Sequence, residues 1–249
     1  MKGSTIPRAV SVVGFHGAGK TKLVVSIIKE LVRRGYRVGT VKHIPERNFT
    51  IDQAGKDTWT HARAGAELVV SLAPGELARI EKRSGGLDEI LGGLSGIDFV
   101  IVEGFKSFRG LARIIVARNR AEVNELADEF TIACVGFSSS SIPSFDFKQV
   151  KEIVDLIEQR SFPPLPGIDC KHCGFESCEK FAIAVVSGRR RWEECQALAR
   201  EVVLKIDGRQ IPLKPFVQEF LAGAIKGMVS SLKDTQGRNI EIMVINRDG

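Results

Sequence analysis

Gly14-Phe15-His16-Gly17-Ala18-Gly19-Lys20-Thr21 is the stretch of this sequence that decides the fold. It fits the phosphate-binding loop pattern G-x-x-x-x-G-K-[ST] at every fixed position. The valine-rich run Ala9 to Val13 before it predicts a buried strand. The helical spacing of apolar residues from Lys22 to Arg34 predicts a helix, which Gly35 ends. Strand, glycine turn and helix follow one another as the pattern requires.

This loop predicts a nucleoside triphosphate site. Glycines allow backbone N–H groups to close around phosphate oxygens, and the helix dipole favours their negative charge. Lys20 would reach the terminal phosphates, and the Thr21 hydroxyl would hold Mg²⁺. The expected binding residues are Gly14, His16, Gly17, Ala18, Gly19, Lys20 and Thr21.

A strand that ends in an acidic residue forms the second half of the expected site. Asp98 to Glu103 contains four apolar residues with an acid at each end. We expect a buried parallel strand that presents Glu103 at its carboxyl end, where ligands bind in open α/β sheets. Glu103 would hold magnesium through water or position an attacking water, and is the candidate catalytic residue. Asp98 would lie at the opposite edge as a capping or surface residue.

The remaining pattern of the first 160 residues indicates an α/β fold of the P-loop NTPase type, with a mostly parallel sheet and helices on both faces. Further strands are expected at 37–41, 67–72, 77–81, 114–117 and 131–137, and further helices at 87–94 and 148–159.

Composition indicates an ordinary globular protein. The 249 residues are 43% hydrophobic and 27% charged, with a formal net charge of +6. No apolar run approaches the ~18 residues of a membrane span, and the N-terminus has no signal-peptide core. We therefore expect a cytoplasmic protein without a membrane partner. Nucleic acid is not expected, because no aromatic and basic stripe is present.

Residues 161–167 are rich in proline and predict a linker between two domains, 1–160 and 161–249. Within the second domain, 200–249 predicts a hairpin, a helix and a last strand. Asp207-Gly208 is the turn between strands 202–206 and 209–213. An apolar helical stripe from Val217 to Leu232 is expected to be core, and residues 240–245 are the expected strand.

Four of the five cysteines crowd into one segment, with the spacing Cys170-x2-Cys173-x4-Cys178-x16-Cys195. In a reducing compartment such crowding favours metal over disulfides. A [4Fe–4S] cluster is the main hypothesis and zinc is the alternative. Zinc is second because zinc sites usually show two close pairs of cysteines, whereas Cys178 and Cys195 are far apart in the sequence. An apolar helix, 179–187, would shield the site. Cys134 stands alone and predicts a buried small residue.

Residues 8 to about 160 resemble the family of molybdopterin-guanine dinucleotide biosynthesis protein B (MobB). The phosphate-binding loop is shared with many families, and the more specific segments are Thr40-Val41-Lys42-His43, Asp52 to Ala66 with Gly55-Lys56-Asp57-Thr58 and His61, and Val102-Glu103-Gly104-Phe105-Lys106. Glu46, Arg47 and Asn48 depart from the His/Asp-rich stretch expected before Asp52.

The resemblance implies a GTP-binding adapter in molybdenum or tungsten cofactor biosynthesis, which assists attachment of GMP to molybdopterin. It implies a MobA-like molybdopterin guanylyltransferase as partner, with contact to molybdopterin or to molybdoenzymes, and we expect a homodimer. Hydrolysis should be weak, because Arg109, Arg113 and Arg118 lie in no recognisable arginine-finger motif. No Asn-Lys-x-Asp motif is present, so GTP rather than ATP follows from the resemblance alone.

Residues 168–195 are similar to the small iron–sulfur domain of the electron-transport complex B subunit and of corrinoid iron–sulfur proteins. The Cys173-Gly174-x3-Cys178 core and the sixteen-residue gap to Cys195 carry this resemblance, whereas Gln196-Ala197-Leu198 replaces the expected Pro-Gly-Gly. Two other functions stay open. One is a nucleotide-driven iron–sulfur carrier or redox protein, although the loop lacks the early second lysine of such carriers, and the other is a small-molecule kinase.

Overall fold

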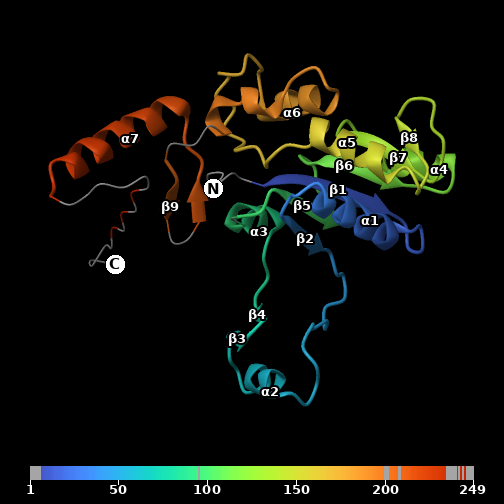
Figure 1. The fold of residues 1–249 in the computed structure, drawn as a ribbon, viewed down its shortest axis with the longest axis horizontal. Helices are drawn as coiled ribbons and strands as arrows, with labels where there is room; N and C mark the ends of the chain where they lie inside the picture. Colours follow the sequence, from blue (N-terminus) through green and yellow to red (C-terminus); the bar gives the residue numbers. More distant parts are fainter. Residues whose placement is uncertain are drawn as a thin grey trace.

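The computed structural model describes residues 7–94, 96–198, 202–206, 209–233, 240, 242 and 244. Its centre is a six-stranded sheet in which every pair of neighbours is parallel, in the order β2-β5-β1-β6-β7-β8 (Figure 1). The strands are β1 (Arg8–Gly14), β2 (Val38–Lys42), β5 (Phe99–Glu103), β6 (Ala112–Val116), β7 (Thr131–Val135) and β8 (Ser144–Phe145). The expected fold class is confirmed.

Helices cover both faces of this sheet, because the side chains of a strand alternate between the two faces. The helices are α1 (Lys20–Arg33), α3 (Leu87–Gly93), α4 (Arg120–Leu126) and α5 (Val150–Arg160). On β1, Val10 and Val12 pack in the cluster that contains α1 and α5. Ala9 packs with α3 and Val13 with α4 on the opposite face. Sequence reasoning assigned no helix at α4.

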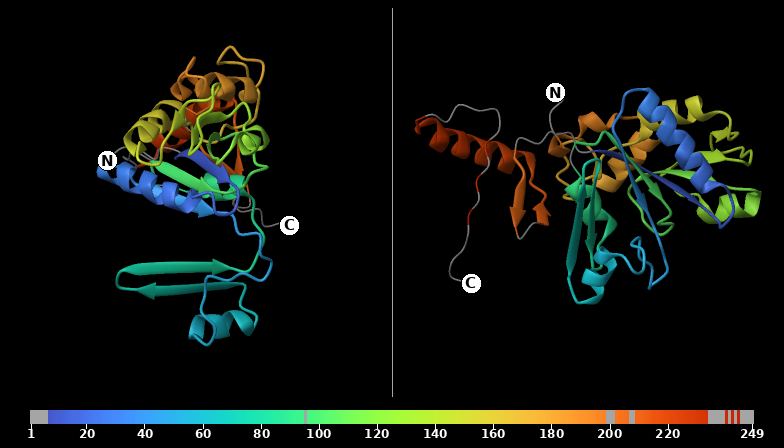
Figure 2. Two further views of the ribbon diagram at one scale, coloured as in Figure 1. Left: turned by 90° about the vertical axis from the view of Figure 1, so that its right-hand side faces the viewer. Right: turned by 60° about the horizontal axis from the view of Figure 1, so that its bottom comes forward.

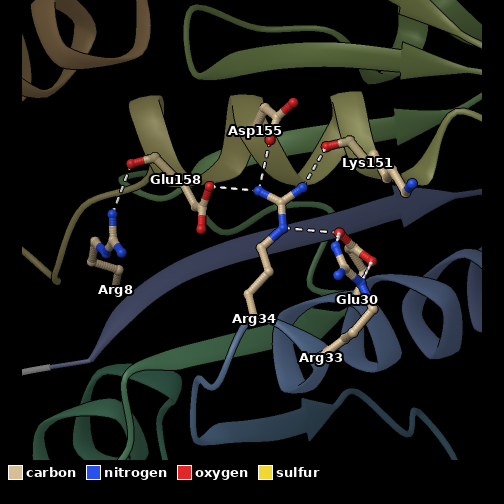
Figure 3. Close-up of polar contacts among 7 residues, drawn as sticks. All are labelled: Arg8, Glu30, Arg33, Arg34, Lys151, Asp155 and Glu158. Carbon is tan, nitrogen blue, oxygen red and sulfur yellow. Dashed lines mark hydrogen bonds and ion pairs between the residues drawn. The ribbon is translucent and has the colours of Figure 1, made fainter.

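The end of α1 is tied to α5 by a polar network around Arg34 (Figure 3). Arg34 Nη1 lies 2.6 Å from both Asp155 Oδ1 and Glu158 Oε2, and Arg34 Nε donates to Glu30 Oε1 at 2.9 Å. Hydrogen bonds from Arg33 and Arg34 lower the pKa of Glu30 to about 2. The two helices are thereby held side by side.

Residues 43–86 leave the sheet and form a separate lobe, below the sheet in Figure 1 and apart from it in the left view of Figure 2. The lobe contains α2 (Asp57–Arg63) and an antiparallel hairpin of β3 (Leu68–Ala73) and β4 (Glu76–Glu81). The strand expected at 67–72 therefore exists, but it pairs with β4 and is not part of the main sheet. Leu68, Val70 and Leu72 alternate along one exposed face of the hairpin.

The segment after α5 packs onto the sheet. Phe162 is fully buried, and its carbonyl accepts the Ala9 N–H at 3.0 Å in an isolated bridge beside β1. Helix α6 (Cys178–Val186) buries Phe181 and Val185 in the same cluster as Val10 and Val12. The cysteine segment therefore shares a core with the α1–α5 face. The division into domains 1–160 and 161–249 stays a prediction.

Between α6 and the last helix lie two short 3₁₀ helices, η1 (Trp192–Glu194) and η2 (Gln196–Leu198), and a small hairpin of β9 (Leu204–Ile206) and β10 (Arg209–Ile211). The predicted Asp207-Gly208 turn lies outside the described residues. So does most of the predicted strand 240–245, whose described residues Ile240, Ile242 and Val244 adopt no strand.

Helix α7 (Pro215–Ser230) extends away from the sheet on the left of Figure 1. The prediction that its apolar stripe is core is wrong. Only Gln218 and Ala222 are buried, while Met228 and Leu232 are each about three-fifths exposed, at 62% and 61%. The helix is anchored at its first turn, because Gln218 Nε2 donates to the carbonyls of Ala197 and Leu213. Among the described helices, none combines the length and apolar character of a membrane span.

Candidate functional site

The phosphate-binding loop lies at the carboxyl edge of the sheet, between the end of β1 and the start of α1. Its glycines are required by space and conformation. A methyl group on Gly14 would come within 2.7 Å of the Val116 carbonyl oxygen. Gly17 and Gly19 adopt φ angles of 73° and 96°, which residues with a Cβ rarely adopt. The sequence therefore builds the expected turn, with α1 beginning at Lys20.

Lys20 and Thr21 occupy the positions expected of a triphosphate site. Lys20 Nζ donates to the Phe15 carbonyl at 2.8 Å, so its ammonium lies at the mouth of the loop. Desolvation lowers the pKa of Lys20, against the attraction of Glu103. Thr21 Oγ1 donates to Glu103 Oε1 at 2.9 Å. The structure thus joins the predicted second acidic strand to the loop.

Sheet register places Glu103 beside a further lysine. Val12 on β1 and Lys42 on β2 flank Glu103 in the parallel ladder, and Lys42 Nζ lies 3.4 Å from Glu103 Oε1. Glu103 is only 9% exposed, so its carboxylate is held between Thr21 and Lys42 with little contact to solvent. Hydroxyl and carboxylate oxygens are the donors that Mg²⁺ prefers. The side chains of Thr21 and Glu103 therefore fit a magnesium ion on bound phosphates.

The chain turns sharply after Glu103 and passes over the loop. Gly104 has a φ of 95° and its Cα approaches His43 so closely that a methyl group would lie 2.9 Å from the His43 Cβ. Lys106 Nζ then lies 3.8 Å from the centroid of the Phe15 ring. Lys20, Lys42 and Lys106 therefore surround the loop. Sequence reasoning used Lys42 and Lys106 only for resemblance, although Lys42 ends β2 and Lys106 is the third residue after β5.

The arginines considered as possible fingers are engaged elsewhere. Arg113 is 5% exposed and lies 2.8 Å from Asp128, and it donates to the carbonyls of Lys106 and Phe108. Arg118 Nε donates to Glu122 at 2.9 Å. Arg109 lines a cavity of about 260 Å³ beside Cys178, at the other edge of the sheet. Arg109 and Arg113 therefore lie away from the terminal phosphate, whereas Arg118 lies two residues after β6 at the carboxyl edge, where its guanidinium is paired with Glu122.

The four clustered cysteines line one small pocket with Phe175 and Phe181 in its wall. The pocket loop has an unusual backbone, since Asp169 and Lys171 on either side of Cys170 adopt positive φ angles of 45° and 63°. Asp169 Oδ1 accepts the Cys178 N–H at 2.7 Å, which ties the start of the loop to the start of α6.

The chemistry of these thiols suits a metal. Burial raises the pKa of the Cys178 thiol and raises that of Cys195 to about 11. Metal binding would therefore displace protons. Among the described residues, which include all five cysteines, no three His, Cys, Asp or Glu side chains form a group that could hold a single ion. Cys134 lies apart, fully buried on β7 in the cluster that contains α4.

The two candidate sites lie at opposite edges of the sheet. The chain that leads to the cysteines bridges β1 near its start, at Ala9–Phe162, and Cys178 shares a cavity with Leu111 and Phe130, which precede β6 and β7. The phosphate-binding loop begins at the other end of β1, at Gly14. Five residue steps of extended chain span roughly 17 Å. A group held by the cysteines therefore has no direct contact with phosphates held at the loop.

Comparison with known proteins now gives a consistent result. A family model described as "Molybdopterin guanine dinucleotide synthesis protein B" matches residues 9–136, and one described as "Putative Fe-S cluster" matches residues 165–204. A Methanocaldococcus jannaschii protein is 30% identical over 231 residues, which cover 91% of this chain and 92% of the relative. It is named "Putative molybdopterin-guanine dinucleotide biosynthesis adapter protein".

A Haemophilus influenzae molybdopterin-guanine dinucleotide biosynthesis adapter protein is 30% identical over 158 residues, covering 60% of this chain and 86% of the relative. Two crystal structures share the fold. Bacillus subtilis MobB is 24% identical with a TM-score of 0.52, covering 61% of this chain and 96% of that one. A molybdopterin-guanine biosynthesis protein B is 31% identical with a TM-score of 0.50, covering 60% and 96%.

Proposed function

This chain belongs to the molybdopterin guanine dinucleotide synthesis protein B (MobB) family, and we propose that it is a GTP-binding adapter in the biosynthesis of that dinucleotide. The observation that carries the proposal is the contact of Thr21 with Glu103 at the end of the phosphate-binding loop. It joins the two halves of a nucleotide site that lie 82 residues apart in the chain. The relatives from M. jannaschii and H. influenzae are both named as adapter proteins of this biosynthesis.

In the proposed site, backbone N–H groups of residues 14–19 bind phosphate oxygens and Lys20 neutralises the terminal phosphate. Thr21 and Glu103 hold Mg²⁺, with Glu103 acting directly or through water. The Lys42 ammonium, 3.4 Å from Glu103 Oε1, partly neutralises the negative charge of the Glu103 carboxylate. These roles follow from the donor chemistry and from the position of each side chain at the carboxyl edge.

Hydrolysis by this chain alone should be slow, which suits an adapter better than an enzyme. An arginine finger contributes ~10³ to 10⁵ in rate, and Arg113 and Arg118 are each held by a carboxylate of this chain. We therefore propose that the bound nucleotide serves a partner. A MobA-like guanylyltransferase, which would attach GMP to molybdopterin, is the expected one.

The test uses Lys20→Ala in the whole chain, with Lys29→Ala on the exposed side of α1 as matched control. Calorimetry with Mg²⁺ and GTP should show loss of binding for Lys20→Ala and wild-type affinity for the control, with unchanged circular dichroism. Capture of the guanylyltransferase by wild type, weakened by Lys20→Ala, would support the adapter. Equal GTP affinity in wild type and Lys20→Ala would refute the site.

We further propose that Cys170, Cys173, Cys178 and Cys195 hold a [4Fe–4S] cluster. The four thiols face one pocket, so the donor set fits. Zinc, which four thiolates can also bind, is the alternative occupant of the same pocket. When bound, the cluster would supply an electron-transfer centre or a crosslink for the loop.

Anaerobic preparation tests this proposal. Wild-type protein should contain about four irons and four sulfides per chain, as the cluster formula requires, and absorb in the blue. Cys178→Ser should lose both the absorption and the iron, whereas Cys134→Ser, the matched control, should keep them. One zinc per chain without sulfide would make the segment a structural zinc site instead.

A further inference from the structure

The strand order brings two loops beyond β7 and β8 to the edge that carries the phosphate-binding loop. All six strands are parallel, so the carboxyl ends of β1, β6, β7 and β8 lie on one edge. Residues 136–143 follow β7 and residues 146–149 follow β8 before α5 begins. A nucleotide with its phosphates on α1 can extend its base toward these loops.

Phe147 connects these loops physically to the phosphate site. A methyl group on Gly19, the last glycine of the phosphate-binding loop, would come within 3.0 Å of the Phe147 ring. A methyl group on Gly136, at the end of β7, would come within 3.2 Å of the same ring. The Lys22 ammonium lies 5.7 Å from the ring centroid. Phe147 is half-buried, so part of its surface is exposed next to α1.

The neighbouring residue is an exposed carboxylate in a fixed position. Asp146 Oδ1 accepts the Lys148 N–H at 2.9 Å, and the Asp146 N–H donates to Gln149 Oε1 at 2.8 Å. These bonds hold the turn at the start of α5. A carboxylate has about four acceptor positions, so Asp146 keeps capacity for a ligand.

The chemistry of this pair distinguishes purine bases. An aromatic ring stacks on any base, because every base has a π-face. A carboxylate accepts hydrogen bonds only, so it matches an edge with two adjacent donors. Guanine has such an edge in its N1–H and exocyclic N2 amine, whereas adenine presents an acceptor at N1 beside a donor.

We propose that Phe147 packs against the base of the bound nucleotide and that Asp146 reads its guanine edge. The inference rests on the proposed nucleotide site and adds the residues that would select GTP over ATP. It supplies a residue-level reason for guanine in a chain that lacks the Asn-Lys-x-Asp motif. The competing explanation is structural: Asp146 only shapes the turn before α5 and Phe147 only fills space beside Gly19.

The experiment separates the base from the phosphates. Calorimetry with Mg²⁺ compares GTP, ATP, XTP and inorganic tripolyphosphate on wild type, Phe147→Ala and Asp146→Asn, with Phe220→Ala on the exposed face of α7 as control. Phe147→Ala should weaken GTP by about 5- to 150-fold, the range for loss of one base–aromatic stack. It should leave tripolyphosphate unchanged.

Asp146→Asn gives the sharper result. Xanthine carries a carbonyl where guanine carries its N2 amine, so an asparagine amide can donate to it. We expect GTP to weaken by about 5- to 150-fold, the range for one bidentate base contact, and XTP to tighten. Only a folded protein can gain affinity for XTP, so this result would exclude unfolding as the cause of the weaker GTP binding.

Three results would overturn the inference. Equal losses for GTP and tripolyphosphate in Phe147→Ala would show that the ring only supports the loop. Unchanged GTP affinity in both variants would show that the base lies elsewhere, and equal affinity of wild type for GTP and ATP would show that no base is selected. In all of these cases the phosphate site stands. If wild type binds neither tripolyphosphate nor any nucleotide, the proposed function and this inference both fall.

Discussion

Replacement of Asp128 by asparagine should destabilise the protein strongly, because it leaves the Arg113 guanidinium buried without a counter-charge. The two side chains are 7% and 8% exposed, and their charged atoms lie 2.8 Å apart. Removal of one partner of such a pair typically costs about 3–5 kcal/mol. Asparagine keeps the shape of aspartate and the acceptor that binds the Phe130 N–H at 3.0 Å, so the change isolates the charge.

The expected loss translates into a measurable shift. At about 2–4 °C per kcal/mol for a chain of this size, Asp128→Asn should lower Tm by roughly 6–20 °C. Glu129→Gln is the matched control on the next residue. Its partner Arg109 lies 4.0 Å away and both side chains are more than half exposed, so the cost should be at most about 1 kcal/mol.

A double-mutant cycle with Arg113→Met completes the measurement. The single change Arg113→Met should also be costly, because it leaves Asp128 unpaired and frees the carbonyls of Lys106 and Phe108. The double variant should be more stable than additivity predicts, by an amount near the top of the roughly 0.5–3 kcal/mol range for residues in contact. Thermal unfolding by circular dichroism measures all four proteins. Additivity within about 0.5 kcal/mol, or a loss for Asp128→Asn no larger than for Glu129→Gln, would refute the reasoning.

Three further predictions concern other parts of the molecule. The pKa of Glu30 is lowered to about 2 in the folded protein, so its stabilising bonds are fully present above the ordinary carboxyl pKa of about 4.3. These bonds are lost as the pH falls toward 2, and Glu30→Gln should therefore make Tm less dependent on pH between about 4.3 and 2. The expected homodimer would cover the exposed apolar face of the β3–β4 hairpin, so Leu72→Glu should shift the protein to monomer in sedimentation, and an unchanged mass would exclude this face. Glu103→Gln should weaken Mg²⁺-dependent GTP binding more than Mg²⁺-independent binding, since the carboxylate beside Thr21 is the proposed metal contact; equal effects would remove that role.

The part of the fold around the phosphate-binding loop could be predicted because local pattern and tertiary context agree there. The run before Glu103 is continuously apolar and the run before Gly14 is interrupted only by Ser11, and such segments are typical of strands buried on both faces. The hairpin strand β3 has an equally good strand pattern, but periodicity does not say which strand it pairs with. In the structure β3 pairs with β4, the next strand along the chain, in a sheet separate from the main one.

Two other features lay beyond sequence reasoning. The stripe on α7 has the period of a buried helix face, but burial needs a surface to pack against, and in the described helix only Gln218 and Ala222 are buried. The positive φ angles of Asp169 and Lys171 are invisible in a sequence, because neither is glycine. The cysteine spacing indicated a shared site, but not that it would lie at the edge opposite Thr21.

The placement of the two sites at the two ends of β1 has a thermodynamic consequence. Since the groups they would hold cannot touch, any influence of one on the other must be a difference in stability transmitted through the strand and its packed neighbours. Such linkage is reciprocal: if loading of the cysteines changed GTP affinity by some factor, GTP would change retention of the loaded metal by the same factor. The rate at which iron is lost to a chelator, with and without nucleotide, would then report on a site at the far end of β1.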